Sequence, residues 1–111
     1  METIDDGRLL RIYVGEDETV AGQPLHEAIL ELMRRRGLAG ATVIRGMAGF
    51  GRSSVVHTAR FLRMSEDLPV LVEAVDTAEK IEAIVPELDE LIADGLMTIE
   101  KVEVHLYRGS G

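Results

Sequence analysis

Hydrophobic and polar positions along the chain follow two periods, which predict strands and helices in a definite order. Residues 8–14 alternate between apolar and polar side chains, and this period of two predicts a first strand. After Pro24 the apolar residues recur every three or four positions as far as Met33, the stripe of an amphipathic helix. The run Arg34-Arg35-Arg36-Gly37 suits the C-terminal end of that helix. Cations face the negative end of the helix dipole, and glycine accepts the left-handed cap conformation.

The middle of the chain predicts two further strands separated by a long connection. Residues 41–51 are β-branched at first and then rich in glycine, which predicts a second strand with a bulge near Gly46. A polar connection spans residues 52–67. Residues 68–75 are apolar with Glu73 as their one charge, as expected of a third strand covered on both faces for most of its length.

The C-terminal part predicts a second helix and a last strand. Apolar residues at helical spacing occupy positions 81–92, and Asp76 with Glu79 predicts a capping pair before them. Pro86 removes one backbone hydrogen bond, so we expect a kink or break in this helix. Residues 97–107 alternate again and predict a fourth strand.

The order of elements is βαβ followed by βαβ. With right-handed crossovers it predicts an α+β fold, the ferredoxin-like βαββαβ sandwich, with a four-stranded antiparallel sheet and two helices on one face. We expect a single domain at residues 8–108, with flexible termini at 1–7 and 109–111.

One face of the predicted sheet has no helix to cover it. Exposed apolar patches larger than a few hundred Å² usually mark association, so we expect a homo-oligomer. The alternative is that outward residues such as Arg11, Glu73 and Glu103 leave this face solvated.

Length and composition exclude several classes of protein. The chain has 111 residues, which fits one domain, and 46% hydrophobic residues, which suffice for a core. It has no cysteine, hence no disulfide or thiolate metal site, and a reducing cytoplasm is the expected compartment. Its longest uncharged apolar runs are far shorter than the roughly 18 residues of a membrane span, so no direct membrane insertion is expected.

Charge is segregated along the chain. There are 12 basic and 20 acidic residues, and an acidic chain is a poor non-specific nucleic-acid binder, so no nucleic-acid partner is expected. Between Leu32 and Ser65, however, there is no Asp or Glu. The seven cations of that stretch are Arg34, Arg35, Arg36, Arg45, Arg52, Arg60 and Arg63. Such a zone suits a small anion, and the alternative is that these arginines pair with acidic helices across the surface.

Candidate catalytic and metal-binding groups are sparse. His26, His57 and His105 lack metal-ligand spacing, and we expect no metal site. Ser53 and Ser54 lie near His57, but no third group orients them as nucleophiles, so no catalytic residue is predicted and the protein is expected not to be an enzyme.

The most specific segment is Gly49-Phe50-Gly51-Arg52. Glycines let backbone N–H groups approach a ligand, and the following arginine supplies a bidentate partner for phosphate or carboxylate. Together with Gly40-Ala41-Thr42-Val43, Arg45-Gly46 and Ser65-Glu66-Asp67-Leu68-Pro69-Val70, it resembles PII signal-transduction proteins. From Leu10 to Val104 the chain more closely resembles an uncharacterised family of short PII-like proteins.

The resemblance implies a homotrimer whose sheets line a central core, with small effectors in clefts between neighbouring subunits. It makes an adenine nucleotide the candidate effector, with no required cofactor. Residues 52–67 resemble the T-loop, which grips a regulated protein; a transporter or channel is a candidate partner. PII proteins also carry a lysine-rich loop before the last strand, where this chain has only Asp94-Gly95-Leu96.

Carried over by residue, the resemblance implies a phosphate side at Gly49–Arg52, a base side near Thr42 and a C-terminal phosphate contact at Arg108. The ligand-binding set is Thr42, Arg45, Gly49, Phe50, Gly51, Arg52 and Arg108. The partner-contacting loop set is Ser53, Ser54, His57, Thr58, Arg60 and Arg63.

The sequence therefore predicts a non-enzymatic PII-like regulator that binds a small anionic effector. Two alternatives remain at this point: a trimer that handles small molecules or cations, like the CutA divalent-cation-tolerance proteins, and an enzyme of ferredoxin-like fold.

Overall fold

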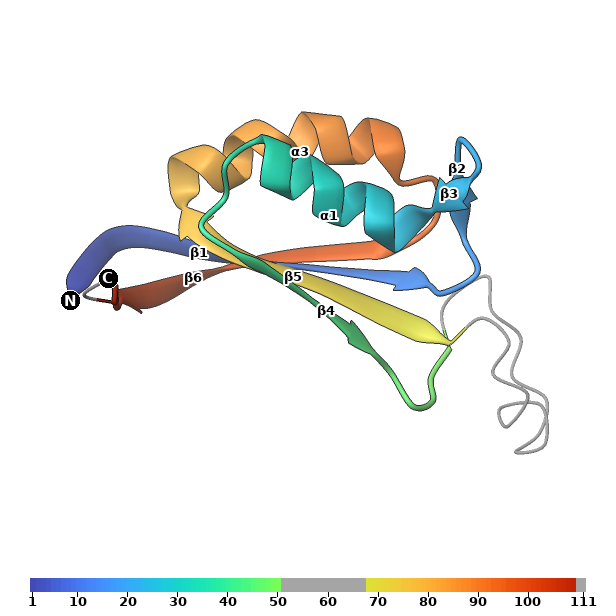
Figure 1. The fold of residues 1–111 in the computed structure, drawn as a ribbon, viewed down its shortest axis with the longest axis horizontal. Coiled ribbons are helices and arrows are strands. Elements are labelled where there is room, and N and C mark those ends of the chain that lie inside the picture. Colours follow the sequence, from blue (N-terminus) through green and yellow to red (C-terminus); the bar gives the residue numbers. More distant parts are fainter. Residues whose placement is uncertain (51–67, 110–111) are drawn as a thin grey trace.

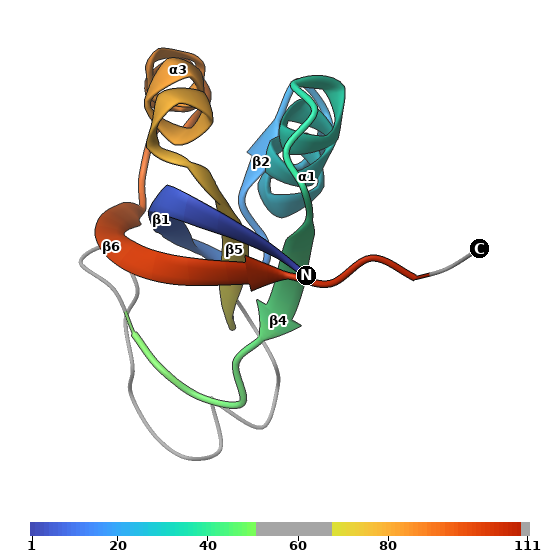
Figure 2. The same cartoon turned by 90° about the vertical axis from the view of Figure 1, so that its left-hand side faces the viewer.

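The computed structural model describes residues 1–50 and 68–109, which form a four-stranded antiparallel sheet with two helices on one face (Figures 1 and 2). The strands lie in the order β4-β5-β1-β6. Their bounds are β1 Glu2–Gly15, β4 Ala41–Arg45, β5 Pro69–Thr77 and β6 Leu96–Leu106. The helices are α1, Leu25–Arg35, and α3, Ala78–Leu91. The predicted α+β, ferredoxin-like arrangement is confirmed.

The core lies between the helices and the sheet face that they cover. In β5 every second residue is buried, as the period of a strand requires, and the same alternation runs through the second half of β1. The largest fully buried side chains are Leu10, Ile12, Ile29, Met33, Val70, Val72, Ile81, Ile84 and Leu88. Both helices thus contribute the apolar stripes that the sequence predicts.

Particular residues account for where α1 ends and where α3 begins. α1 ends with Arg34 and Arg35 in its last turn, and Gly37 has a φ of 73°, in the left-handed region that the sequence predicts for a cap. At the start of α3 the cap is Thr77, whose Oγ1 accepts a hydrogen bond from Lys80 N at 3.2 Å. The predicted capping role of Asp76 with Glu79 is therefore wrong: Asp76 is buried under the α1–β4 connection.

The sequence predicts a kink or a break near Val85; α3 continues through Pro86 as one helix, so the break is absent. Ile84 and Leu88, on either side of the proline, are fully buried. Packing of this face against the sheet offsets the one hydrogen bond that proline cannot donate.

The sequence places residues 1–7 in a flexible terminus, whereas the structure includes residues 2–7 in β1. This part of β1 pairs with the end of β6, beyond a register shift between Ile4 and Gly7. Gly7 permits the pairing, because a Cβ there would lie 2.6 Å from Val104 Cγ2 and 2.8 Å from the Val102 carbonyl oxygen. The paired ends of β1 and β6 extend beyond the helices (Figure 1).

A short hairpin that the sequence does not predict joins β1 to α1. It consists of β2, Thr19–Val20, and β3, Gln23–Pro24. Its two turn residues both have positive φ, 50° for Ala21 and 82° for Gly22, as in tight hairpin turns.

The face of the sheet opposite the helices carries both apolar and charged side chains. Tyr13 and Leu96 are exposed partners in the β1–β6 register, whereas the centre of the face carries Arg11, paired with Glu73 and Glu100. The sequence predicts Glu103 on this face, but successive side chains of a strand point to opposite faces, and its neighbour Val104 lies on this one. Glu103 therefore lies on the other face of β6, where it pairs with His105 at 2.5 Å. The face thus carries both exposed apolar side chains, which favour association, and charged ones, which favour a solvated face.

Candidate functional site

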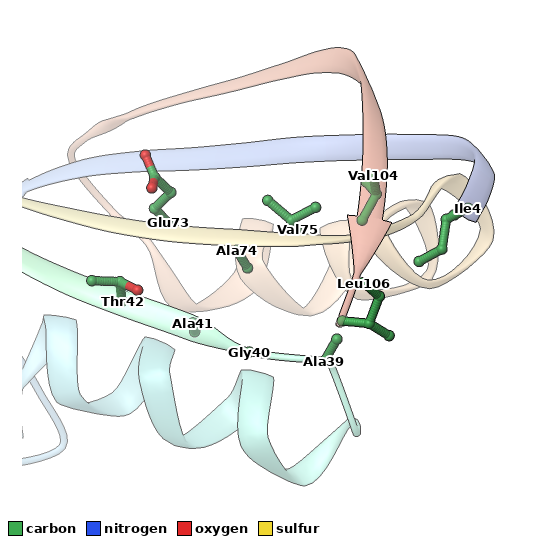
Figure 3. Close-up of a pocket in the computed structure, with 10 residues that line it drawn as sticks. All are labelled: Ile4, Ala39, Gly40, Ala41, Thr42, Glu73, Ala74, Val75, Val104 and Leu106. Atoms are coloured by element: carbon green, nitrogen blue, oxygen red, sulfur yellow. The ribbon is translucent and has the colours of Figure 1, made fainter. Parts of the chain in front are cut away.

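A pocket of about 370 Å³ lies on the helix-free side of the sheet (Figure 3). Its walls come from the start of β4 with the residues before it, the middle of β5, and the paired ends of β1 and β6. The lining residues are Ile4, Ala39, Gly40, Ala41, Thr42, Glu73, Ala74, Val75, Val104 and Leu106. Most of this lining is aliphatic or backbone; Thr42 and Glu73 supply its polar side chains.

Small side chains at the entry to β4 help to leave this space open. Residues 39–41 are Ala, Gly and Ala, and a Cβ built on Gly40 would meet no atom within 4 Å. On the opposite side, the bulge of β1 at Gly7 brings Ile4 into register with Val104. The pocket therefore depends on the strand pairing that lengthens β1 beyond its predicted start.

Glu73 links the pocket to the centre of the open sheet face. Its Oε2 accepts a hydrogen bond from Arg11 Nε at 3.1 Å, and Arg11 Nη1 donates to Glu100 Oε1, also at 3.1 Å. The hydrogen bond to Glu73 raises the pKa of Arg11 above its usual value. Glu73 is therefore an oriented acceptor at the pocket wall, held by a guanidinium from β1.

Among the described residues of the predicted ligand set, Thr42 lines the pocket. Its register partner across the sheet is Glu73, so the two polar groups share one face. Arg45 pairs in register with Val70, an odd number of residues away from Glu73, and therefore lies on the opposite face of the sheet. The structure does not bring Thr42 and Arg45 into one site within a single chain.

Two of the arginines predicted to bind anions, Arg45 and Arg108, are engaged by carboxylates. Arg45 forms an ion pair with Glu16, just after β1. Arg108 donates to Glu2 Oε1 through Nε at 3.2 Å and Nη2 at 3.0 Å. Both arginine side chains are about 70% exposed, 69% for Arg45 and 73% for Arg108, so each keeps free donors toward solvent.

The glycine segment after β4 lies against the start of β5. Gly46 N donates to Pro69 O at 2.7 Å directly after β4 ends, where the sequence predicts a bulge. Gly49 has a φ of 158° and a backbone close to Pro69, since a Cβ there would lie 3.0 Å from Pro69 Cγ. Phe50 is exposed.

The remaining predicted site residues fall outside the described parts of the chain. These are Gly51 and Arg52 of the ligand set and Ser53, Ser54, His57, Thr58, Arg60 and Arg63 of the loop set.

The sequence did not identify most of the pocket wall. Glu73 could have been found, because a single carboxylate in the otherwise apolar segment 68–75 needs a cationic partner or a ligand. Ile4 and Leu106, from opposite ends of the chain, carried no such signal.

The described residues form neither a metal-binding cluster nor a membrane-spanning helix. Within residues 1–50 and 68–109, no group of three or more His, Asp or Glu side chains is placed to hold a metal ion. No helix in these same ranges has the length and apolar character needed to cross a membrane.

Comparison with known proteins identifies close relatives along almost the whole chain. Residues 7–104 match the DUF190 family, described as "Uncharacterized ACR, COG1993". A UPF0166 protein of Aquifex aeolicus is 40% identical over 97 residues, which cover 87% of this chain and 91% of the relative. A UPF0166 protein of Methanocaldococcus jannaschii is 36% identical over 103 residues, covering 92% of this chain and 93% of the relative.

Solved structures show the same fold at lower identity. A putative PII-like signalling protein of Thermus thermophilus superposes with a TM-score of 0.62 at 21% identity, over 94% of this chain and 93% of its own. CPII of Thiomonas intermedia, solved with ADP and bicarbonate bound, superposes with a TM-score of 0.55 at 18% identity, over 88% of this chain and 87% of its own. The chain therefore belongs to the DUF190 (UPF0166) family of uncharacterised proteins, and its fold is that of the PII-like signalling proteins.

Proposed function

We propose that this protein is a cytoplasmic, non-enzymatic regulator that binds an adenine nucleotide and acts on a partner protein through residues 52–67. The observation that carries the proposal is the Thr42 pocket. It is concave, mostly aliphatic and about 370 Å³ in volume, within the usual range of small-molecule sites. It occurs on a fold shared with CPII, a protein solved with ADP bound.

The chemistry of the pocket suits a purine base with an amino group. Aliphatic walls from Ile4, Val75 and Leu106 can contact a flat ring, and the Thr42 hydroxyl can donate and accept. The Glu73 carboxylate only accepts, so it favours a base that presents an amino group over one that presents a carbonyl oxygen there. Among the strands of the described residues β4 is also an edge strand, and the outer backbone groups of an edge strand can bind a base.

The phosphates require cations that this pocket lacks. Arg45 lies on the other face of the sheet from Thr42, and the sequence assigns Arg52 to the same anion-binding segment. We therefore propose that the effector lies between two copies of the chain, with the base on one copy and the phosphates on its neighbour. A homotrimer of this kind would also cover exposed apolar groups of the open sheet face, such as Tyr13 and Leu96.

Thermal shift and calorimetric titration of the purified protein with ADP, ATP, AMP and GDP test this proposal. A ligand at about 100 times its Kd adds about 2.7 kcal/mol, enough to raise the Tm by several degrees. Thr42→Val keeps the side-chain volume and removes the hydroxyl, and should weaken adenine nucleotide binding about tenfold, the equivalent of about 1.4 kcal/mol. Thr19→Val, an exposed threonine of β2 outside the pocket, is the matched control.

Arg52→Ala should lose nucleotide binding while the assembly keeps about three times the 12.2 kDa chain mass in light scattering. Silence toward all four nucleotides would refute the proposal. A shift with a divalent cation or a simple carboxylate instead would favour the CutA-like alternative.

A further inference from the structure

Glu16 joins the two ends of the segment that separates β4 from β5. Its carboxylate forms the ion pair with Arg45, the last residue of β4. Its backbone N–H donates to Leu68 O at 2.7 Å, one residue before β5 begins. One residue therefore contacts both the strand that leads into the long connection and the residue that follows it.

The two partners of this ion pair differ in exposure. The Glu16 side chain is 18% exposed, whereas the Arg45 side chain is 69% exposed. A largely buried carboxylate needs its cation, but a guanidinium with five N–H donors can receive a solute anion from its open side. An anion that binds Arg45 must then do so beside a fixed negative charge.

We infer that Glu16 is a built-in competitor for the anionic group of the effector at Arg45, and that it selects polyanions over monoanions. The inference rests on the proposed function, in which Arg45 belongs to the anion side of the site. Glu16 carries a single negative charge and needs no translational entropy to reach Arg45. A singly charged carboxylate from solution gains no electrostatic advantage over it, whereas a di- or triphosphate does.

Calorimetric titration with inorganic pyrophosphate and with acetate, at constant ionic strength, tests the inference on the full chain. We expect the wild type to bind pyrophosphate and not acetate. Glu16→Gln should bind pyrophosphate about fivefold more tightly, about 1 kcal/mol at 1.4 kcal/mol per tenfold. Glu16→Asp, which keeps the charge but draws it back by one methylene, should show a smaller gain and decides the question where the glutamine variant fails to fold.

Matched controls separate this effect from a general change in charge. Glu31→Gln also removes one carboxylate paired with an arginine, Arg34 on α1, and should leave the pyrophosphate affinity unchanged. The gain of Glu16→Gln should vanish when Arg45→Gln is added to it. Binding by Glu16→Gln where the wild type shows none would support the inference in its strongest form.

Equal affinity of wild type and Glu16→Gln would overturn the inference, as would an equal gain in Glu31→Gln or silence of both proteins toward pyrophosphate. These results are distinguishable from failure of the proposed function. Nucleotide binding that Thr42→Val weakens and Glu16→Gln leaves unchanged overturns only the competition. A pyrophosphate gain without any nucleotide preference overturns only the nucleotide assignment.

Discussion

Asp76 is the one buried charged side chain among residues 1–50 and 68–109, and its removal gives the sharpest test of the fold around the pocket. It is 5% exposed. Its Oδ2 accepts a hydrogen bond from Ala39 N at 2.8 Å, and its Oδ1 accepts one from Thr77 N at 2.7 Å. The carboxylate thus ties the connection before β4 to the junction of β5 and α3.

Asp76→Ala leaves both backbone N–H groups without this acceptor. Each unpaired donor costs about 1–3 kcal/mol: about 1 kcal/mol for Ala39 N, because Ala39 is exposed and water can reach it, and about 1.5 kcal/mol for Thr77 N, because Thr77 is half-buried. We therefore expect a loss of about 2.5 kcal/mol in the free energy of unfolding. At about 4 °C per kcal/mol for a domain of this size, the Tm should fall by about 10 °C. Asp76→Asn keeps one acceptor oxygen and should lose about half as much.

Urea unfolding followed by far-UV circular dichroism measures this loss, at fixed protein concentration because an assembly makes stability depend on concentration. Asp89→Ala, an exposed carboxylate on α3, is the control and should stay within about 0.5 kcal/mol of the wild type. Since Ala39 lines the pocket, folded Asp76→Ala should also bind adenine nucleotides more weakly. An Asp76→Ala protein as stable as the control would show that these two hydrogen bonds contribute no net stability.

Two further predictions concern pH and close packing. Arg36 donates two hydrogen bonds to Glu87, at 2.6 and 2.5 Å, and they lower the pKa of Glu87. This pair therefore stabilises the fold above the unfolded pKa of glutamate, and that stabilisation is lost as the pH falls through the lowered folded pKa. Thermal melts should therefore show a smaller drop in Tm on acidification for Glu87→Gln than for the wild type, and parallel drops would contradict the assignment. Gly7→Ala places a Cβ 2.8 Å from the Val102 carbonyl oxygen and should lower the free energy of unfolding in urea by about 2 kcal/mol. Gly40→Ala, whose Cβ would have no atom within 4 Å, should leave it almost unchanged. Equal losses in the two variants would refute the packing argument.

The elements that the sequence predicts are those with a local period. The alternation of Leu10, Ile12 and Val14 and the helical stripe of α1 depend on neighbours within about ten residues, and the structure confirms both. Pro86 shows the limit of such signals, because the packing of α3 on the sheet overrides a local helix breaker.

The elements that the sequence misses depend on partners far along the chain. Residues 2–6 contain three acidic side chains and read as a tail, yet Ile4 is paired with Val104, 100 positions away. The hairpin β2–β3 has strands of two residues, and its turn includes Ala21, which carries no positive-φ signal. The pocket could not be predicted for the same reason, since part of its wall depends on this pairing of residues far apart in the sequence.

Ion pairs formed in the fold also change the interpretation of the stretch between Leu32 and Ser65, which contains no Asp or Glu. Arg36 and Arg45 have no carboxylate near them in sequence, yet the fold supplies Glu87 to one and Glu16 to the other. For Arg36 the partner lies on a helix, as the surface-pairing alternative expects. For Arg45 the partner lies just after β1, beside the proposed anion site. An arginine-rich sequence is therefore not the same as a free positive surface. If Arg45 binds an effector, the measured affinity is the difference between two competing pairs, so changes in Glu16 should alter it as directly as changes in the ligand.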